Sequence, residues 1–345
     1  MISHSRPTID EEEINAVSAA LRFGQIAQGE QVALFEDALA SLIGAKGGVA
    51  TSSGTAALHL SLLVLGIGEG DEVVIPGFVC AALLNAVRLV RATPILADIN
   101  RETFNIDVQD IKRRLTKKTK AVLVPHMFGL AADIREIVSL GVPVIEDCAQ
   151  SLGSHYEGAR TGSYGLLSVF SFYATKVICT GEGGMVTSND EALLLKIRDL
   201  RGYDEKDNDA LRDNYKLTDM QAAMGLAQLQ KLPGMIARRR EIAAIYDGAL
   251  QKYPVSFPFC PRNRDHIFYR YVVRTPRLMD VLASGEKNGI GYRRPVYKPL
   301  HRYLGKAGYP ETEAAFKEAL SIPIYPTLKN QEIKAIIENL SQILE

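Results

Sequence analysis

Two polar signatures lie close together near the middle of the sequence. The apolar run 142–145 ends abruptly in two acids, the second of which is Asp147, and the apolar run 168–172 presents Ser171 and then Lys176. A β-rich run that closes on a carboxylate indicates a buried strand whose acid lies at the C-terminal edge of a sheet. The lysine stands just ahead of a glycine-rich turn. We therefore expect the acid and the lysine to act as a pair.

The pairing of Asp147 with Lys176 fits pyridoxal phosphate, which needs a lysine for its Schiff base and an acid facing its pyridinium nitrogen. The carboxylate keeps the ring nitrogen protonated, so the ring can accept electrons from a neighbouring carbanion. The lysine has to lose its proton to attack an aldehyde, and a partly desolvated pocket favours the neutral amine. Taken singly, Asp147 is equally explained as a helix cap and Lys176 as a surface lysine. Together they predict a catalytic cofactor site.

A third stretch, 49–58, supplies a candidate phosphate site. It runs from an apolar strand through small hydroxyl residues into a helix that extends to about Leu65. The exposed amides and hydroxyls of a helix start bind anions, and Gly54 lets a phosphate approach the backbone. On its own the stretch is also explained by an ordinary Ser/Thr cap. Combined with the acid and the lysine, it predicts the phosphate end of the cofactor.

Composition limits the function classes. The 345 residues suffice for one large and one smaller domain, and 40 basic residues balance 40 acidic ones. A net charge of zero argues against nucleic-acid or anionic-membrane partners. The four cysteines are scattered and no His cluster has metal-ligand spacing, so we expect no metal site and a reduced, cytoplasmic chain. The N-terminus is polar, with Asp10 as N-cap of a helix over 10–22 and Glu13 completing a capping box. From this composition we expect neither a signal peptide nor a membrane span there.

Strands and helices alternate along the first half of the chain. Further strands are predicted at 72–76, 93–97, 120–126 and 142–147, and further helices at 32–43, 79–90, 108–115, 133–140 and 190–200. Such alternation with apolar strands is typical of a parallel sheet covered on both faces. Functional residues collect at the C-terminal ends of these strands. Ser53, Pro76, His126, Asp147 and Ser171 all fall there, so one cleft can hold them.

The last third of the chain predicts a smaller unit. A helix is expected over 217–232, and Pro233 begins a new one that runs to about residue 250. A strand at 266–274 and then helix, strand and helix follow. We therefore expect a large cofactor-binding α/β domain, 1–233, and a small C-terminal α+β domain, 234–345.

The sequence resembles the DegT/DnrJ/StrS family of PLP-dependent nucleotide-sugar aminotransferases. The resemblance runs from about residue 24 to 327, and its motifs are 53–58, 70–73, 146–150, 170–176, 181–185, 214–215, 221–229 and 299–301. It implies the aspartate-aminotransferase-like (fold type I) architecture, an α/β fold with a large, mostly parallel sheet domain and a small C-terminal α+β domain.

The resemblance implies roles around the cofactor ring. Lys176 would hold the cofactor and shuttle a proton, Asp147 would pair with the ring nitrogen, and Gln150 would lie near the ring hydroxyl. The family usually stacks an aromatic residue on the ring at the position of Cys80. Here either Phe78 shifts into this place and contacts the cofactor, or a smaller, polarizable group covers the ring.

The resemblance also implies phosphate ligands. Thr55, the Ala56 amide and Ser171 would hold the phosphate beside Gly54, and Asn214 would reach it from the neighbouring subunit of a homodimer with shared active sites. The polar loop 202–214 that leads to Asn214 is expected to be mobile or to lie at an interface. Lys216 replaces the arginine that is usual in the family, which keeps the charge but loses the bidentate fork.

On the substrate side, Tyr297 and His301 lie in a C-terminal motif near the sugar nucleotide, or else pack at the surface. The chain departs from the family pattern at 202–203 and 130–131, in loops that face the substrates. These departures concern the choice of donor and acceptor rather than the cofactor.

We expect an aminotransferase that moves an amino group from an amino acid, with glutamate as donor, to the keto sugar of a nucleotide-sugar. The product would serve amino-sugar biosynthesis for a surface polysaccharide or a glycosylated metabolite. The alternatives are a PLP-dependent sugar dehydratase, whose family members replace this lysine with histidine, and a non-catalytic regulator on the same fold. Lys176 argues against the first, and the neutral charge and the lack of an appended helix-turn-helix argue against the second.

Overall fold

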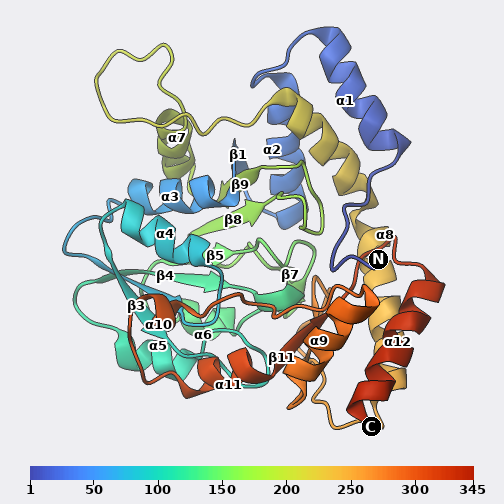
Figure 1. Ribbon diagram of the computed structural model, residues 1–345. Coiled ribbons are helices and arrows are strands. Elements are labelled where there is room, and N and C mark those ends of the chain that lie inside the picture. Colours follow the sequence, from blue (N-terminus) through green and yellow to red (C-terminus); the bar gives the residue numbers. More distant parts are fainter.

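A seven-stranded sheet organises the first half of the chain (Figure 1). The computed structural model covers residues 1–345. The strand order is β1-β9-β8-β5-β4-β2-β3, in which β9 is antiparallel to β1 and β8 and all other pairs are parallel. The strands are β1 Gly47–Thr51, β2 Glu72–Pro76, β3 Thr93–Ala97, β4 Thr119–Pro125, β5 Val144–Asp147, β8 Leu167–Ser171 and β9 Gly184–Ser188. The expected α/β fold with a mostly parallel sheet is confirmed.

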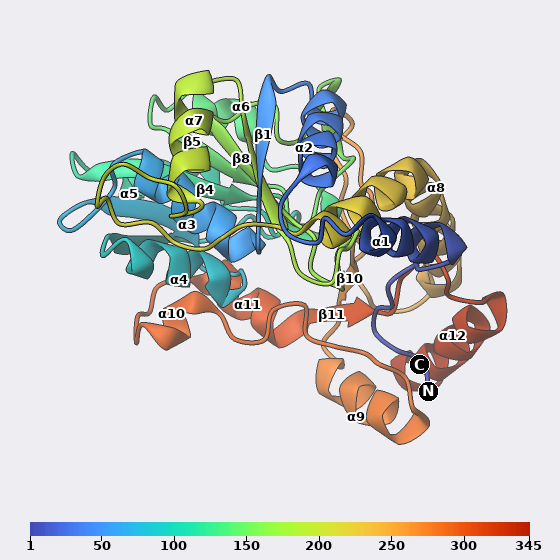
Figure 2. The same ribbon diagram turned by 90° about the horizontal axis from the view of Figure 1, so that it is seen from above.

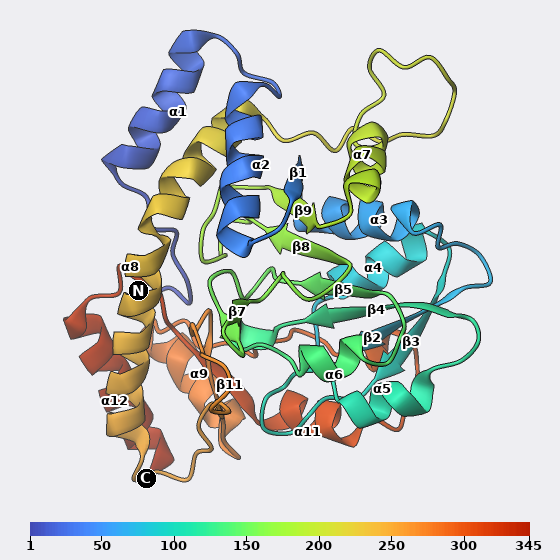
Figure 3. The ribbon, with the colours of Figure 1, turned by 180° about the vertical axis from the view of Figure 1, so that it is seen from behind.

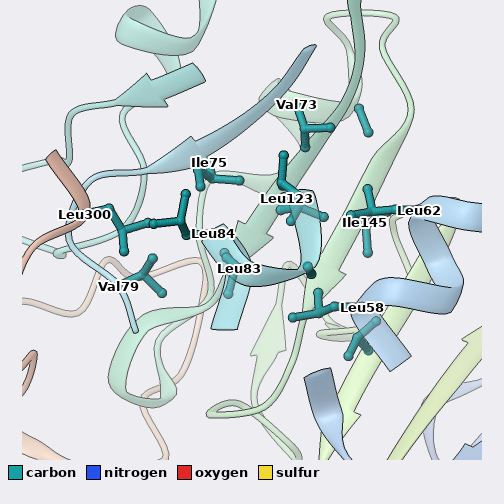
Figure 4. Close-up of a cluster of buried hydrophobic side chains, with 14 of the residues drawn as sticks. Leu58, Leu62, Val73, Ile75, Val79, Leu83, Leu84, Leu123, Ile145 and Leu300 are labelled. Carbon is teal, nitrogen blue, oxygen red and sulfur yellow. The ribbon is translucent and has the colours of Figure 1, made fainter. Parts of the chain in front are cut away.

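Both faces of the sheet are covered by helices, because successive strand residues point to opposite sides. On β2, Val73 and Ile75 join the buried cluster beneath α3 and α4, drawn in Figure 4, whereas Val74 joins the cluster beneath α5 and α6. Figure 1 shows the first pair of helices in front of the sheet and Figure 3 shows the second pair from behind. The helices are α1 Glu11–Phe23, α2 Glu30–Ile43, α3 Gly54–Val64, α4 Ala81–Leu89, α5 Val108–Arg114, α6 Ile134–Val138 and α7 Glu191–Leu200.

Helix α1 begins where its capping signals predict. The Asp10 carboxylate accepts a hydrogen bond from the Glu12 amide at 3.0 Å, and the Glu13 carboxylate accepts one from the Asp10 amide at 2.9 Å. The capping box is therefore confirmed. Two short strands, β6 His155–Tyr156 and β7 Ala159–Arg160, and a 3₁₀ turn, η1 Met127–Gly129, complete this part of the chain.

The prediction of two helices that meet at Pro233 is wrong, because α8 runs unbroken over Asp219–Leu250. Proline removes one backbone hydrogen bond from a helix interior. Tertiary packing offsets that loss: Leu232 and Ile236 are buried in the cluster around α2, and Tyr246 is buried in the cluster of the C-terminal region. The division of the chain at residue 233 stays a prediction, and it falls in the middle of this helix.

The C-terminal region is built on a two-stranded antiparallel sheet, with β10 Tyr271–Arg274 pairing with β11 Ala319–Ile322. Its helices are α9 Leu278–Asn288, α10 Leu300–Tyr303, α11 Pro310–Glu318 and α12 Asn330–Leu344. Figure 2 shows α9, α10, α11 and β11 along one side of the large sheet. None of the helices combines the length and hydrophobicity that a membrane crossing requires.

The predicted strand 266–274 is shorter than expected. Residues before Tyr271 leave the sheet and lie against η1: the Ile267 amide donates to the Gly129 carbonyl at 3.1 Å, and the Arg270 amide donates to the Phe128 carbonyl at 3.3 Å. Phe128 and Phe268 both have positive φ, at 60° and 50°. The two strained turns fit together, and they bring Tyr269 to the edge of the large sheet.

Candidate active site

The carboxyl ends of β1, β5 and β8 meet at one edge of the sheet. In the strand register Thr51 and Ser171 both lie opposite Gly184, and Asp147 lies opposite Val169. The chain therefore brings the end of each of these strands, and the loop that follows it, to the same edge. We call the group of Asp147, Ser171, Lys176, Cys80 and the first turn of α3 the strand-end site.

The first turn of α3 lies directly on β8 and β9. A Cβ at Gly54 would come within 2.8 Å of the Ser171 Cβ, and one at Gly184 would come within 2.4 Å of the Ser53 carbonyl oxygen. Both glycines are required by this close approach. The Ser53 hydroxyl accepts a hydrogen bond from the Ala56 amide at 3.1 Å. Of the expected phosphate ligands, the Ala56 amide is thus already bonded within the chain.

Asp147 ends β5 and is only 7% exposed. One carboxylate oxygen accepts a hydrogen bond from the Ala149 amide at 3.0 Å, and the other has no partner within the chain. Burial raises the pKa of Asp147, whereas the charge of Lys176 and the bond from Ala149 oppose this rise. A buried carboxylate with one free oxygen and a nearby cation is suited to hold a cationic nitrogen.

Glu146, the residue before Asp147, faces the interior. It is fully buried, and it accepts hydrogen bonds from His126 Nε2 at 2.9 Å and from the amides of Gly162 and Gly165 at 2.9 and 2.6 Å. His126 Nδ1 accepts from the Ala132 amide, so Nε2 carries the proton. Burial alone would raise the pKa of Glu146, but these bonds outweigh it and the pKa is lowered. The expectation that His126 shares the site is wrong, because its ring is fully buried behind the sheet edge.

Lys176 lies in the loop between β8 and β9. Its amide donates to the Tyr173 carbonyl at 2.8 Å, and its side chain is half-buried. The Nζ atom lies over the ring of Tyr269, 5.3 Å from the centroid. Its charge acts on both Asp147 and Cys80. The predicted acid and lysine therefore come together, although one ends β5 and the other lies in the loop after β8.

Cys80 and Phe78 face opposite ways. Cys80 is exposed beside Asp147 and Lys176: crowding by the surrounding protein and the charge of Asp147 raise the pKa of its thiol, and Lys176 opposes them. Phe78 is fully buried and stacks on Phe104, with centroids 6.0 Å apart. The prediction that Phe78 contacts the cofactor is therefore wrong, because the core already holds its ring.

Gln150, Tyr297 and His301 differ in how exposed their side chains are and in which groups they contact. The Gln150 side-chain oxygen accepts a hydrogen bond from the Phe128 amide at 3.0 Å, in the turn after Asp147. Tyr297 is 87% exposed. His301 is 3% exposed and bonds Glu313 at 2.5 Å. The prediction that His301 contacts substrate is wrong, because its ring is enclosed behind α11.

Asn214 lies in the extended loop between α7 and α8, which projects from the body in Figures 1 and 3. Its side chain is exposed and makes no hydrogen bond within the chain. The next residue anchors the loop, because the Tyr215 carbonyl accepts from the Ser52 amide at 2.7 Å and its amide donates to the Arg201 carbonyl at 2.9 Å. The loop thus ends beside the first turn of α3.

A separate cavity of about 560 Å³ lies between α1, α2 and the start of α8. Small and apolar side chains such as Ala16, Phe23 and Leu226 form much of its wall. The Asp219 carboxylate there is bound by the amides of Gly29 and two of its neighbours, so it caps α2. This cavity holds no group suited to amino transfer.

Sequence reasoning missed Tyr269. It comes from the segment after α8, far along the chain from Lys176, and it was counted among the strand residues 266–274. The three aromatic residues within 268–271 were a usable signal, because clustered aromatic side chains next to a predicted site supply walls for a ligand.

Comparisons with known proteins agree with this geometry. The sequence model of the DegT/DnrJ/EryC1/StrS aminotransferase family matches residues 7–341. GDP-perosamine synthase of Escherichia coli O157:H7 is 35% identical over 333 residues, which cover 91% of this chain and 90% of that protein. The aminotransferase TlmJ from Streptoalloteichus hindustanus has a TM-score of 0.96 and 31% identity, with 100% of this chain and 99% of that chain covered. The PLP form of the putative sugar aminotransferase Spr1654 from Streptococcus pneumoniae has a TM-score of 0.93 and 27% identity, with 98% and 97% covered. The chain belongs to the DegT/DnrJ/EryC1/StrS aminotransferase family, whose members bind pyridoxal 5'-phosphate.

Proposed function

We propose that this chain is a sugar aminotransferase that moves an amino group from glutamate to the keto sugar of a nucleotide-sugar, with Lys176 and Asp147 as its catalytic residues. The observation that carries the proposal is the convergence of these two side chains beside the first turn of α3. Relatives named for GDP-perosamine and for a UDP-linked oxo-glucuronate support a nucleotide-sugar acceptor. Glutamate as donor is inferred from the family resemblance.

The donor groups at the strand-end site fit pyridoxal phosphate. The amides and hydroxyls of Thr55 and Ser171, with Gly54 lacking a side chain, suit a phosphate at a helix N-terminus. The free oxygen of Asp147 suits a protonated ring nitrogen, and Lys176 suits the aldehyde. When bound, the group supplies an electrophilic carbon and an electron-withdrawing ring. A phosphate that also binds the Ala56 amide has to share it with the Ser53 hydroxyl.

Each residue has its own task in the proposed reaction. Asp147 would hold the proton on the ring nitrogen through its unpartnered oxygen, and its burial would strengthen that interaction. Lys176 Nζ removes the proton from the α-carbon of the donor amino acid and later returns a proton to the sugar carbon. Gln150, fixed by the Phe128 amide, would lie near the ring hydroxyl. Exposed Cys80 would cover the ring in place of an aromatic side chain, and exposed Tyr297 would contact the nucleotide-sugar.

The reaction is tested in two phases, starting from the aldehyde form of the bound cofactor and continuing with the amino form that the donor produces. Glutamate, glutamine and aspartate are compared for their ability to bleach the visible band of the loaded enzyme, and keto nucleotide-sugars are then screened for its return. We expect glutamate to bleach the band fastest and a keto nucleotide-sugar to restore it. Lys176→Ala serves as the control that loses both phases. Failure of every keto nucleotide-sugar, with an enzyme that glutamate bleaches, would refute the proposed acceptor.

We further propose a cytoplasmic homodimer in which Asn214 of one subunit reaches the phosphate of the other. The exposed, unbonded side chain of Asn214 and the projecting loop support it, and four free cysteines are consistent with a reducing compartment. The test mixes Lys176→Ala chains with chains that carry Asn214→Asp and Lys216→Glu. Each parent is inactive, and verified mixed dimers should recover activity because one of their two sites is intact. Mixed dimers without activity would overturn the shared site.

A further inference from the structure

Tyr269 lies against the proposed catalytic lysine, although it comes from the segment that follows α8. The Lys176 Nζ lies over the Tyr269 ring at 5.3 Å from its centroid, and the tyrosine is only 5% exposed. The Thr175 hydroxyl lies 3.5 Å from the Tyr269 hydroxyl, within hydrogen-bond reach. The loop that bears Lys176 therefore contacts one tyrosine through two consecutive residues.

The backbone of Tyr269 is fixed from several sides. The Tyr269 carbonyl accepts a hydrogen bond from Arg239 Nη1 at 3.2 Å. Arg239 Nη1 also donates to the Ile324 carbonyl at 3.0 Å. The residues before and after Tyr269 hold η1 through the bonds of Ile267 and Arg270 described above. Because the segment is anchored on both sides of Tyr269, the position of the ring is set by η1 and α8 rather than by the loop of Lys176.

The charged groups that act most strongly on Tyr269 are all cations. Besides Lys176, the guanidinium of Arg270 lies 5.2 Å from the ring centroid, and buried Arg239 adds a third charge. Arg270 is itself bonded to the ring of His4, which burial and Arg270 keep neutral by lowering the pKa of His4 to about 3. The acid of the site, Asp147, lies at the end of β5, where the charge of Lys176 acts on it and where it acts on the Cys80 thiol.

This surrounding favours the ionised phenol. Burial opposes the phenolate, but Lys176, Arg270, the Thr175 hydroxyl and Arg239 outweigh it and lower the pKa of Tyr269 to about 8. Most other buried tyrosines of the chain are shifted the opposite way; burial raises the pKa of Tyr246, for example. Tyr269 is therefore the tyrosine that can lose its proton to solvent near neutral pH and leave an anion beside Lys176.

We propose that Tyr269 is a positioning residue for Lys176. The Tyr269 ring holds the Lys176 ammonium in place, and once the Tyr269 hydroxyl has ionised, charge attraction restrains this ammonium further. The inference rests on the proposed function, because it gives Tyr269 its role through Lys176. The ring fixes where Nζ lies, and the phenolate holds the Lys176 ammonium at this place, away from an approaching electrophile.

The test follows the reactivity of Lys176 in the full chain freed of cofactor. Trace acetylation with isotopically labelled acetic anhydride and peptide mapping give the labelling of Lys176 relative to Lys196, an exposed lysine of α7. Wild type is compared with Tyr269→Phe, and Tyr173→Phe removes a hydroxyl from an exposed tyrosine of the same loop as the matched control. At about pH 9 the ratio should rise roughly three- to tenfold in Tyr269→Phe, and at about pH 6.5 it should stay near the wild-type value.

A second readout follows tyrosine ionisation itself. The ultraviolet absorbance of tyrosinate in wild type should show one transition near pH 8, which Tyr269→Phe loses and Tyr173→Phe keeps. Lys176→Met removes the neighbouring charge and should move this transition upward by about one pH unit. This variant also decides the question if Tyr269→Phe does not fold.

Unchanged labelling and an unchanged titration in Tyr269→Phe would overturn the inference, as would a transition near pH 8 that persists in Lys176→Met. Neither readout involves turnover. A chain that fails as a sugar aminotransferase can still show the Tyr269–Lys176 pair, and an active enzyme without the pair would refute only this inference.

Discussion

The interior behind the strand ends and the strand-end site in front of them differ in how completely neighbouring side chains are bonded and buried. Glu146 faces the interior, where every oxygen is bonded and its pKa is lowered, whereas Asp147 faces the site with one free oxygen and a raised pKa. Phe78 and Cys80 divide in the same way, one stacked in the core and the other exposed. A fully bonded acid stabilises the fold, and an incompletely bonded one retains binding capacity for a ligand.

The largest expected effect lies in the interior. Phe78→Ala removes a fully buried ring from its stack on Phe104, and we expect it to lower the free energy of unfolding by about 3 to 5 kcal/mol. Urea unfolding of the cofactor-free chain measures this. Cofactor affinity of the protein that remains folded should be near wild type, and a selective loss of affinity with unchanged stability would contradict the assignment of Phe78 to the core.

Asp147→Asn tests the acid that faces the strand-end site. The variant keeps the shape but loses the charge that holds the ring proton, so kcat should fall a hundredfold or more, about 3 kcal/mol in activation free energy. The fold should remain intact, as circular dichroism would verify. Glu146→Gln is the matched control, because the same change one residue earlier should act on stability first. A near-native rate in Asp147→Asn would mean that this acid is structural.

The pH dependence of stability should separate the two acids by sign. The lowered pKa of Glu146 contributes stability above the ordinary value of a glutamate, which is lost as the pH falls through the folded value. The raised pKa of Asp147 costs stability above its folded value, and this cost disappears as the pH falls to the ordinary value of an aspartate. At neutral pH, Glu146→Gln should therefore destabilise the cofactor-free chain by about 2 kcal/mol and Asp147→Asn should stabilise it by about 1 kcal/mol.

The effect of Asp147→Asn should vanish as the pH falls to the ordinary value of an aspartate, whereas the effect of Glu146→Gln should begin to shrink only below the ordinary value of a glutamate. Thermal unfolding at a series of pH values measures them. Shifts of the same sign in the two variants would show that the contrast between the acids is mistaken.

The smallest expected effect sharpens the contrast at Cys80. Cys80→Phe adds an aromatic face beside Asp147 and Lys176, and we expect it to tighten cofactor binding about five- to tenfold, since aromatic stacking contributes about 1 kcal/mol. Fluorescence titration of the cofactor-free chain measures the affinity, with Cys260→Phe as a control at a distant exposed cysteine. Equal tightening in both variants would argue against a position over the ring.

Local signals in the sequence predicted local structure well. The Asp10 and Glu13 capping box specified the start of α1, and the apolar run at 72–76 coincides with β2, because both depend on residues that are close in the chain. The alternation of strands and helices was enough to bring Asp147 and Lys176 to one sheet edge. In a parallel sheet the topology alone decides where the strand ends lie.

The errors come from contacts between distant segments. Pro233 stays helical because two separate cores hold α8, and neither core can be read from the helix sequence. His301 was expected at the substrate, but Glu313 and the ring of Tyr309 enclose it. Tyr269 was missed because its place depends on η1, more than a hundred residues earlier in the sequence.

Helix α8 has a mechanical consequence. Its 32 residues form a rod about 48 Å long, gripped near one end by the cluster around α2 and near the other by the C-terminal cluster. A helix that is fixed at both ends passes a rotation of one end on to the other. It bends most easily at Pro233, because the Leu229 carbonyl lacks an amide donor there. Arg239 follows Pro233 in the helix and donates a hydrogen bond to the backbone of Tyr269. A bend at Pro233 that moves the C-terminal half of α8 would therefore displace Tyr269 relative to the loop of Lys176.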